Sequence, residues 1–423
     1  MAFENRDGGR SQFMSFQNLK AQFNLPLKFW IVASIAFINS VSFTIIIPIL
    51  YPYAREFGLS DFQASLLTTV YAISQFVATP VLGRLSDVLG RKPLLVVSLL
   101  GTVLANLLAS IAPVAGLLYF ARILDGLTGG NSSIAKAVIS DTTTPADRAK
   151  AFGLFDAAFR LGFVTGPAIS YFAQTLPTFP GVSPLGMSFF AGAAIAALAT
   201  ALTVFCLPET LPAREPFQWR WKMFGFGKIL RSAKHPQLGR VFLLTFASGF
   251  TFTIFTFAFQ PFFLNVLDRD AKDLAVMFTL FGVLGVLTQI FAVGPIVQRF
   301  NLANVLVAAI AARGLAFLAL PAFPVLPIFV GLVCWLGVAN SFPMPLISAI
   351  LSANTSDREQ GEIQGINASY LSISNALGPA VAGVLVSLGY GTPFWVTGVL
   401  TLLAAGWAWS LKSMLNCDCR ASA

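Results

Sequence analysis

The stretch Gly83-Arg84-Leu85-Ser86-Asp87-Val88-Leu89-Gly90-Arg91-Lys92-Pro93 decides the fold of this chain. It is a short, strongly charged turn between two long apolar runs. Residues 63–82 before it and 94–113 after it carry no charge. Uncharged runs of about 20 residues are long enough to cross the hydrocarbon core of a bilayer. The stretch is therefore predicted to join two membrane helices.

The composition of the whole chain indicates a polytopic membrane protein. Of its 423 residues, 56% are hydrophobic and only 11% are charged, against about 25% charged in soluble domains. Backbone hydrogen bonding in lipid makes such a chain helical. We expect an all-α polytopic membrane protein with twelve transmembrane helices in two pseudo-symmetric halves of six. The predicted spans are residues 29–51, 61–82, 94–112, 116–139, 151–172, 185–207, 241–267, 274–297, 302–323, 325–351, 363–388 and 393–411.

The polar segments between the spans predict the domain boundaries and the orientation. We expect an N-terminal tail (1–27), a first half (28–207), a central loop (208–240), a second half (241–411) and a C-terminal tail (412–423). In this arrangement 20 of the 27 Lys and Arg residues lie on the side of the two tails, three lie on the opposite side and four lie within spans. Cytoplasmic loops carry an excess of Lys and Arg. Both termini are therefore expected in the cytoplasm, and the bilayer is expected to be the cell (inner) membrane.

Several other classes of protein are disfavoured. The net charge of +9 does not indicate nucleic-acid binding, because the basic residues occupy loops as in other membrane proteins. The four Cys, two within spans and two in the tail, form no disulfide framework and no four-ligand metal site. No nucleophile–base or metal-binding set is visible, so we predict no enzyme, no metal and no cofactor. The expected partners are a small-molecule substrate and the lipid bilayer, and the expected state is a monomer.

The two halves repeat each other. Asp147-Arg148, Gly153 and Gly166-Pro167 recur as Asp357-Arg358, Gly365 and Gly378-Pro379. The opening stretch has a weaker copy beginning at Gly294, in which Gln298 stands at the position of Asp87. Small residues permit close helix packing, and Pro bends a helix. The predicted packing residues are Gly162, Gly166, Pro167, Gly378 and Pro379.

Three motifs resemble those of the major facilitator superfamily of transporters. The opening stretch is similar to its Gly-x-x-x-Asp-x-x-Gly-Arg-Lys loop, Arg122-Ile-Leu-Asp-Gly to its Arg-x-x-x-Gly element, and Gly162 to Pro167 to the Gly-x-x-x-Gly-Pro element of its antiporters. The resemblance covers all twelve spans and is greatest for the drug:proton antiporter branch, above all the tetracycline exporters. It implies a gate that latches the two halves on the cytoplasmic side. The predicted gating residues are Gly83, Asp87, Gly90, Arg91, Lys92 and Arg148.

The ionisable residues within the first half are candidates for proton coupling. Asp125 and Asp156 are the two carboxylates well inside predicted spans. Arg122 shares a helix face with Asp125, and Asp156 is expected to pair with Arg160 four residues later. A partly desolvated carboxylate beside an Arg can titrate, and the resemblance associates Arg122 with proton transfer. Either acid could carry the proton, or both could stay permanently paired.

A second set of residues is predicted to line a substrate cavity. Its polar and aromatic members suit an amphipathic organic molecule, and they are Asn39, Gln75, Phe252, Phe255, Gln260, Gln289, Arg313, Asn340 and Asn375. Arg313 has three possible roles: pairing across the interface, attracting an anionic substrate, or snorkelling toward the cytoplasm. The expected function is export of a small drug-like compound by proton antiport with alternating access. The alternatives are a uniporter or symporter for a sugar or other nutrient, and a non-transporting receptor.

Overall fold

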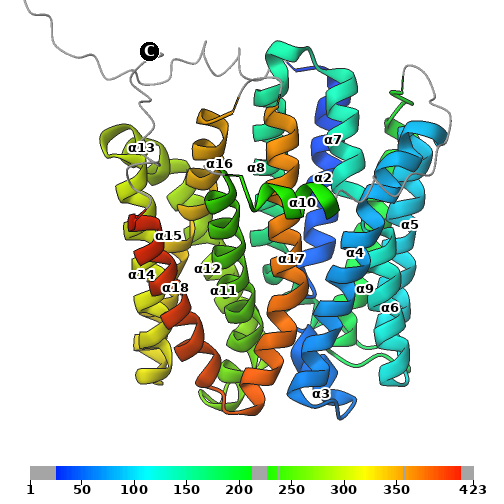
Figure 1. Cartoon of the computed structure of the whole chain (residues 1–423). Coiled ribbons are helices and arrows are strands. Elements are labelled where there is room, and N and C mark those ends of the chain that lie inside the picture. Colours follow the sequence, from blue (N-terminus) through cyan, green and yellow to red (C-terminus); the bar gives the residue numbers. More distant parts are fainter. Residues whose placement is uncertain (1–24, 212–225, 236–237, 356–358, 411–423) are drawn as a thin grey trace, which may run out of the picture.

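The computed structural model describes residues 25–211, 226–235, 238–355 and 359–410, and every regular element in these ranges is helical (Figure 1). The predicted C-terminal tail, residues 1–24 of the predicted N-terminal tail and about half of the predicted central loop lie outside the described residues. The helices of the first half are α2 (Leu27–Thr44), α3 (Leu50–Glu56), α4 (Asp61–Leu89), α5 (Arg91–Ser110), α6 (Ala115–Thr128), α7 (Asn131–Thr142), α8 (Pro145–Ala173) and α9 (Gly186–Cys206). They are followed by α10 (Phe226–Ser232), α11 (Leu238–Asn265), α12 (Ala271–Thr288), η2 (Gln289–Val293), α13 (Gly294–Arg299), α14 (Leu302–Ala322), α15 (Leu326–Asn340), α16 (Pro343–Ala353), α17 (Gln360–Ser387) and α18 (Thr392–Ser410).

The long helices stand side by side in two groups that follow the chain (Figure 1). Most first-half helices, coloured blue to green, stand on the right, and most second-half helices, coloured green to red, stand on the left, with α8 and α17 overlapping at the centre. The short α10 runs across the bundle instead of along it. The groups meet where α4 packs on α17 and where α8 packs on α12. This all-α architecture agrees with the fold expected from the sequence.

Nine helical segments of the described residues are long and apolar enough to cross a membrane. The other three expected spans coincide with α6 and α7 taken together, with α8, and with α18. Charged residues lower the hydropathy of α7 and α8, and α18 contains three Trp. The helices are therefore consistent with the twelve spans expected from the sequence.

The structure corrects the expected turn between the second and third spans. α4 continues through the charged residues to Leu89, and α5 begins at Arg91, so Gly90 alone separates the two helices. Gly90 has φ 114°, a conformation that glycine adopts without steric cost. Gly83 lies inside α4 with open space where a Cβ would stand, so no close helix approach explains it.

Several spans that were predicted as continuous are interrupted. The first breaks between α2 and α3, at a segment that contains Pro48, and the fourth breaks at Gly129-Gly130. The eighth contains the π-helical segment η2, and the tenth breaks just before Pro343. Gly and Pro are poor residues for a helix interior. The helices coincide with the predicted spans, but the apolar runs did not predict these breaks.

The first and fifth spans of each half pack closely in the same way. In the first half a Cβ on Gly166 would collide with Thr44, and a Cβ on Gly162 would collide with Ser40. In the second half a Cβ on Gly378 would collide with Thr253 in the same manner. The small residues before Pro167 and Pro379 therefore lie at helix contacts, and the repeat in the sequence corresponds to a repeat in the packing.

The halves also meet at the end of the bundle predicted to be extracellular. The backbone N–H of Tyr51 donates to Gln260 Oε1 at 3.4 Å, and Asn265 Nδ2 donates to the Tyr51 hydroxyl at 3.4 Å. That hydroxyl donates in turn to Asp61 Oδ1 at 2.6 Å. Ser65 of α4 fills the space beside Gly383 of α17. These contacts join the two halves at that end.

Candidate functional site

Asp87 and Arg91, on either side of Gly90, form described ion pairs with residues of the first half. Arg91 pairs with Asp87 one turn earlier and, through Nε, with Asp141 Oδ2 of α7 at 2.9 Å. Arg91 Nη1 also donates to Ser86 Oγ at 2.6 Å. These contacts hold the ends of α4, α5 and α7 together. The described ion pairs of Asp87 and Arg91 thus link first-half helices to one another and not the two halves, unlike the expected latch.

Glu209, which follows α9, caps the start of α5. Its carboxylate accepts the backbone N–H groups of Arg91 at 3.0 Å and Lys92 at 3.3 Å. It also accepts the N–H groups of Thr210 and Leu211. Partial burial works against the ionised carboxylate, but the four N–H donors outweigh it and hold the pKa of Glu209 below its ordinary value. A carboxylate at a helix N-terminus is further stabilised by the helix dipole.

Arg148, the remaining predicted gating residue, lies in the first turn of α8. Its Nη2 donates to the backbone oxygen of Ser140 at 3.0 Å. This bond ties the start of α8 to the end of α7. Arg148 therefore lies near the predicted cytoplasmic end of the first half but does not belong to the ion pairs of Arg91.

Arg122 and Asp125 form a buried ion pair inside the first half. Arg122 Nη2 lies 2.9 Å from Asp125 Oδ2, and only 2% and 7% of the two side chains are exposed. The guanidinium also lies over the rings of Tyr71 at 5.5 Å and Phe189 at 5.7 Å, positions that favour a cation. Its Nε has no described hydrogen-bond partner. Both side chains of the pair are therefore enclosed by protein.

Asp156 and Arg160 are separated from that pair and, contrary to the prediction, do not pair with each other. Asp156 Oδ1 instead lies 3.2 Å from Lys136 Nζ of α7. Among the described residues Arg160 has no hydrogen-bond or ion-pair partner. Lys136 reaches Asp156 from the neighbouring helix, a contact that spacing along α8 could not reveal. Arg160 is left exposed.

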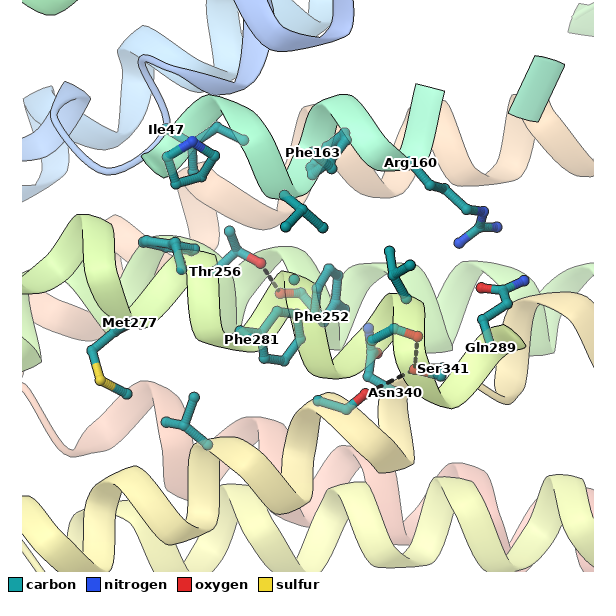
Figure 2. A pocket seen from close by; sticks show the side chains of 18 of the residues that line it. Ile47, Arg160, Phe163, Phe252, Thr256, Met277, Phe281, Gln289, Asn340 and Ser341 are labelled. Atoms are coloured by element: carbon teal, nitrogen blue, oxygen red, sulfur yellow. Dashed lines mark hydrogen bonds between the residues drawn. The ribbon is translucent and has the colours of Figure 1, made fainter. Parts of the chain in front are cut away.

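A cavity of about 440 Å³ lies between α8 on one side and α11, α12 and α15 on the other (Figure 2). Its polar members include Asp156, Arg160, Gln289, Asn340 and Ser341. Aromatic rings supply much of the remaining wall: Phe159, Phe163, Phe252, Phe255, Phe259, Phe278 and Phe281. Because the two halves contribute opposite walls, relative movement of the halves would reshape the cavity.

The structure places four of the nine predicted cavity residues in this wall and five elsewhere. Phe252, Phe255, Gln289 and Asn340 line the cavity. Asn39 accepts a hydrogen bond from Asn131, and Gln75 donates to Tyr71 and Gly129. Gln260 accepts a hydrogen bond from Tyr51. Asn375 is exposed outside this wall. Arg313 is buried behind the wall, where its Nη1 donates to Asn340 Oδ1 at 3.2 Å and its Nη2 donates to Thr251 Oγ1 at 3.3 Å. Of its three possible roles, snorkelling is excluded by this burial.

Sequence reasoning missed four residues that the structure brings into these networks. They are Lys136, Asp141, Glu209 and Ser341. The signal for Lys136 was present, because a lysine inside a predicted span needs a partner. Asp141 and Glu209 stood beside apolar spans but gave no sign of which helix they would reach.

The family model described as Major Facilitator Superfamily matches residues 32–237 and 241–413. The chain belongs to the Major Facilitator Superfamily. The members of this family are membrane transporters and not enzymes, which is the class of protein expected from the sequence. The chain is an integral multi-pass membrane protein whose expected partner is a small molecule.

This facilitator is similar to drug-resistance proteins of bacteria over most of its length. It is 28% identical to "Multidrug resistance protein 2" of Bacillus subtilis (strain 168), with 92% of this chain and 96% of the relative covered. It is 30% identical to "Tetracycline resistance protein, class C" of Escherichia coli, with 86% and 92% covered. These relatives support the drug-efflux branch expected from the motifs.

Its fold is also found in a solved transporter of low sequence identity. A bacterial homolog of the human lysosomal transporter Spinster, in an inward-facing and unoccupied conformation, superposes with a TM-score of 0.74 at 15% identity. The alignment covers 92% of this chain and 97% of that one. This likeness bears on the fold alone.

Proposed function

We propose that this facilitator exports a small amphipathic organic compound by proton antiport with alternating access. The observation that carries the proposal is the aromatic cavity walled by both halves. A site between two moving bodies is the arrangement expected for alternating access in transporters built from repeats. The drug-resistance relatives support an organic substrate and outward transport.

We place the proton at Asp125 and not at Asp156. Asp125 is buried with Arg122 inside the first half, so its protonation would leave the Arg122 charge without its carboxylate. An unpaired buried charge costs several kcal/mol. A conformation that relieves this cost would then be favoured, which is how a bound proton can shift an equilibrium between two states. Asp156 is half exposed, so solvent would screen the loss of its pair with Lys136.

The same proposal covers location and assembly. The excess of Lys and Arg in the predicted cytoplasmic loops supports a cell-membrane protein with both termini inside. One chain supplies every wall of the cavity, so a monomer without nucleic acid suffices.

The test is substrate-dependent proton movement in proteoliposomes, followed with an internal pH-sensitive dye. Wild type should couple the two fluxes, and Asp125→Asn should exchange substrate across the membrane without moving protons. Arg122→Gln/Asp125→Asn serves as a second variant that removes both charges of the pair, and Asp156→Asn, at the other candidate carboxylate, should keep the proton movement. Proton movement in Asp125→Asn equal to that of wild type would place the proton elsewhere. Wild-type counterflow without any uphill transport would instead identify a uniporter.

A further inference from the structure

The charges that line the cavity do not balance. Asp156 is the one carboxylate among its described lining residues, and Lys136 already lies 3.2 Å from it. Arg160 lines the same cavity one helical turn further along α8 and has no described partner. The pair of Lys136 and Asp156 is close to neutral. The wall of α8 therefore presents one uncompensated positive charge to whatever occupies the cavity.

A second positive charge lies behind the opposite wall. Arg313 is 1% exposed, its two described partners, Asn340 and Thr251, are both neutral, and its Nε has no partner. No described carboxylate lies within ion-pair distance of it. A charge in such a poorly solvated position acts over a longer distance than it would in water.

Arg313 also determines what Asn340 can offer to the cavity. A guanidinium only donates, so Asn340 must turn its Oδ1 toward Arg313. The Nδ2 group of Asn340 then has two N–H donors to spare, and neither has a described acceptor. Because Asn340 lines the cavity, these donors are available to a ligand.

Gln289 adds a further donor at the end of the cavity where Arg160 lies. The two side chains reach toward that end from opposite walls, with no dashed line between them (Figure 2). Gln289 is the first residue of the π-helical segment η2. π-Helical segments are rare in proteins as a whole, and those that occur are frequently found at functional sites.

We propose that the substrate of this cavity is an amphipathic organic anion. The carboxylate of this anion is held at Arg160. Gln289 and Asn340, whose side-chain amide is oriented by Arg313, supply neutral hydrogen-bond donors. Its apolar body lies against the phenylalanine wall that includes Phe252 and Phe281. A cationic drug would meet Arg160 directly, and the carboxylate that could attract it is already paired. This proposal rests on the proposed function only in taking the cavity as the transport site.

The experiment measures, by calorimetry, the affinity of three matched probes for the purified full-length chain in detergent. The probes are 2-naphthylacetate, its primary amide and 2-naphthylethylammonium, which share one aromatic body and differ in charge. Charge-assisted hydrogen bonds are worth more than neutral ones, so the carboxylate should bind at least about tenfold more tightly than the amide. The ammonium should bind most weakly.

Variants separate the site from a general effect of charge. Arg160→Gln should remove the preference for the carboxylate over the amide, and Arg160→Lys should keep part of it. Gln289→Leu should reduce it. Arg269→Gln is the matched control, because Arg269 is partly exposed and its described partner is Asp273, away from the cavity.

The outcomes distinguish this proposal from the export mechanism. Equal binding of carboxylate and amide, tighter binding of the ammonium, no carboxylate binding at millimolar concentration, or an unchanged preference in Arg160→Gln would each overturn it. If the ammonium is transported in the proteoliposomes described above, the export proposal stands but the anionic substrate class is wrong. If the carboxylate is bound with the stated preference but is not transported, the substrate class stands and the export proposal fails.

Discussion

Replacing Asp125 with Asn should destabilise this protein far more than replacing Asp156 with Asn. The two carboxylates take part in ion pairs of similar length, 2.9 Å to Arg122 and 3.2 Å to Lys136. They differ in burial. The side chains of the first pair are 2% and 7% exposed, and those of the second are 46% and 54% exposed. The comparison therefore isolates the effect of removing a charge from its partner in a poorly solvated place.

The expected magnitudes follow from that difference. Breaking a buried pair by removing one partner costs about 3–5 kcal/mol, because the other charge stays buried and uncompensated. The rings of Tyr71 and Phe189 lie over Arg122 and would offset about 1 kcal/mol of this. An exposed pair contributes about 0–1 kcal/mol. We therefore expect a loss of about 2–4 kcal/mol for Asp125→Asn and less than about 1 kcal/mol for Asp156→Asn.

Thermal unfolding of purified proteins in one detergent would measure the difference. Asp125→Asn and Arg122→Gln should each lower the unfolding temperature clearly, and Asp156→Asn should barely change it. The double variant Arg122→Gln/Asp125→Asn should be more stable than the sum of the single losses predicts, because it leaves no unpaired charge. Equal shifts for the two Asp→Asn variants, or additive losses in the double variant, would refute the reasoning.

Three further predictions concern packing, pH and the contact between the halves. Gly166→Ala should lower thermal stability by about 1–3 kcal/mol, because the added Cβ would collide with Thr44. Gly153 has open space on the same helix, so Gly153→Ala should be neutral or stabilising by up to about 1 kcal/mol. Equal effects of the two substitutions would contradict the close contact at Gly166. Because the pKa of Glu209 is lowered in the folded protein, its hydrogen bonds stabilise the protein above the ordinary value of 4.5 and this contribution is lost as the pH falls. The stability gap between wild type and Glu209→Gln, measured by thermal unfolding, should therefore be present at neutral pH and shrink in acid, and a gap independent of pH would count against the cap. Tyr51→Phe removes a hydroxyl that bonds to both halves, so it should lower the unfolding temperature by the equivalent of about 1–2 kcal/mol, and an unchanged temperature would mean that these bonds do not stabilise the contact.

The sequence predicted the fold well because the signals for it are local. A span is predicted by an uncharged run, and a loop on the cytoplasmic side by its Lys and Arg, so neither needs knowledge of distant contacts. The spacing of Arg122 and Asp125 likewise indicated a pair on one helix face, which the structure contains. The same rule was wrong for Asp156 and Arg160, since Lys136 of another helix supplies the partner.

The candidate site was predicted less completely because its members come from different helices. Polar residues within spans are all plausible cavity residues when only their helix is known. Gln260 instead joins the halves through Tyr51, and Asn39 bonds to Asn131 inside the first half. Gln289 and Asn340 do line the cavity. Which way each residue faces depends on how the helices rotate and pack, and this is decided by contacts such as that between Gly166 and Thr44.

The charged stretch from Gly83 to Pro93 shows the same division. By itself the sequence determined that membrane helices flank the stretch and that it belongs to a transporter family, and it predicted that the stretch lies on the cytoplasmic side. Only the tertiary structure decided that the stretch is helical except at Gly90, and that Asp141 and Glu209 are its partners. The physical reason is that hydrophobic length and charge are properties of a segment, whereas an ion pair or a cap requires two segments to meet.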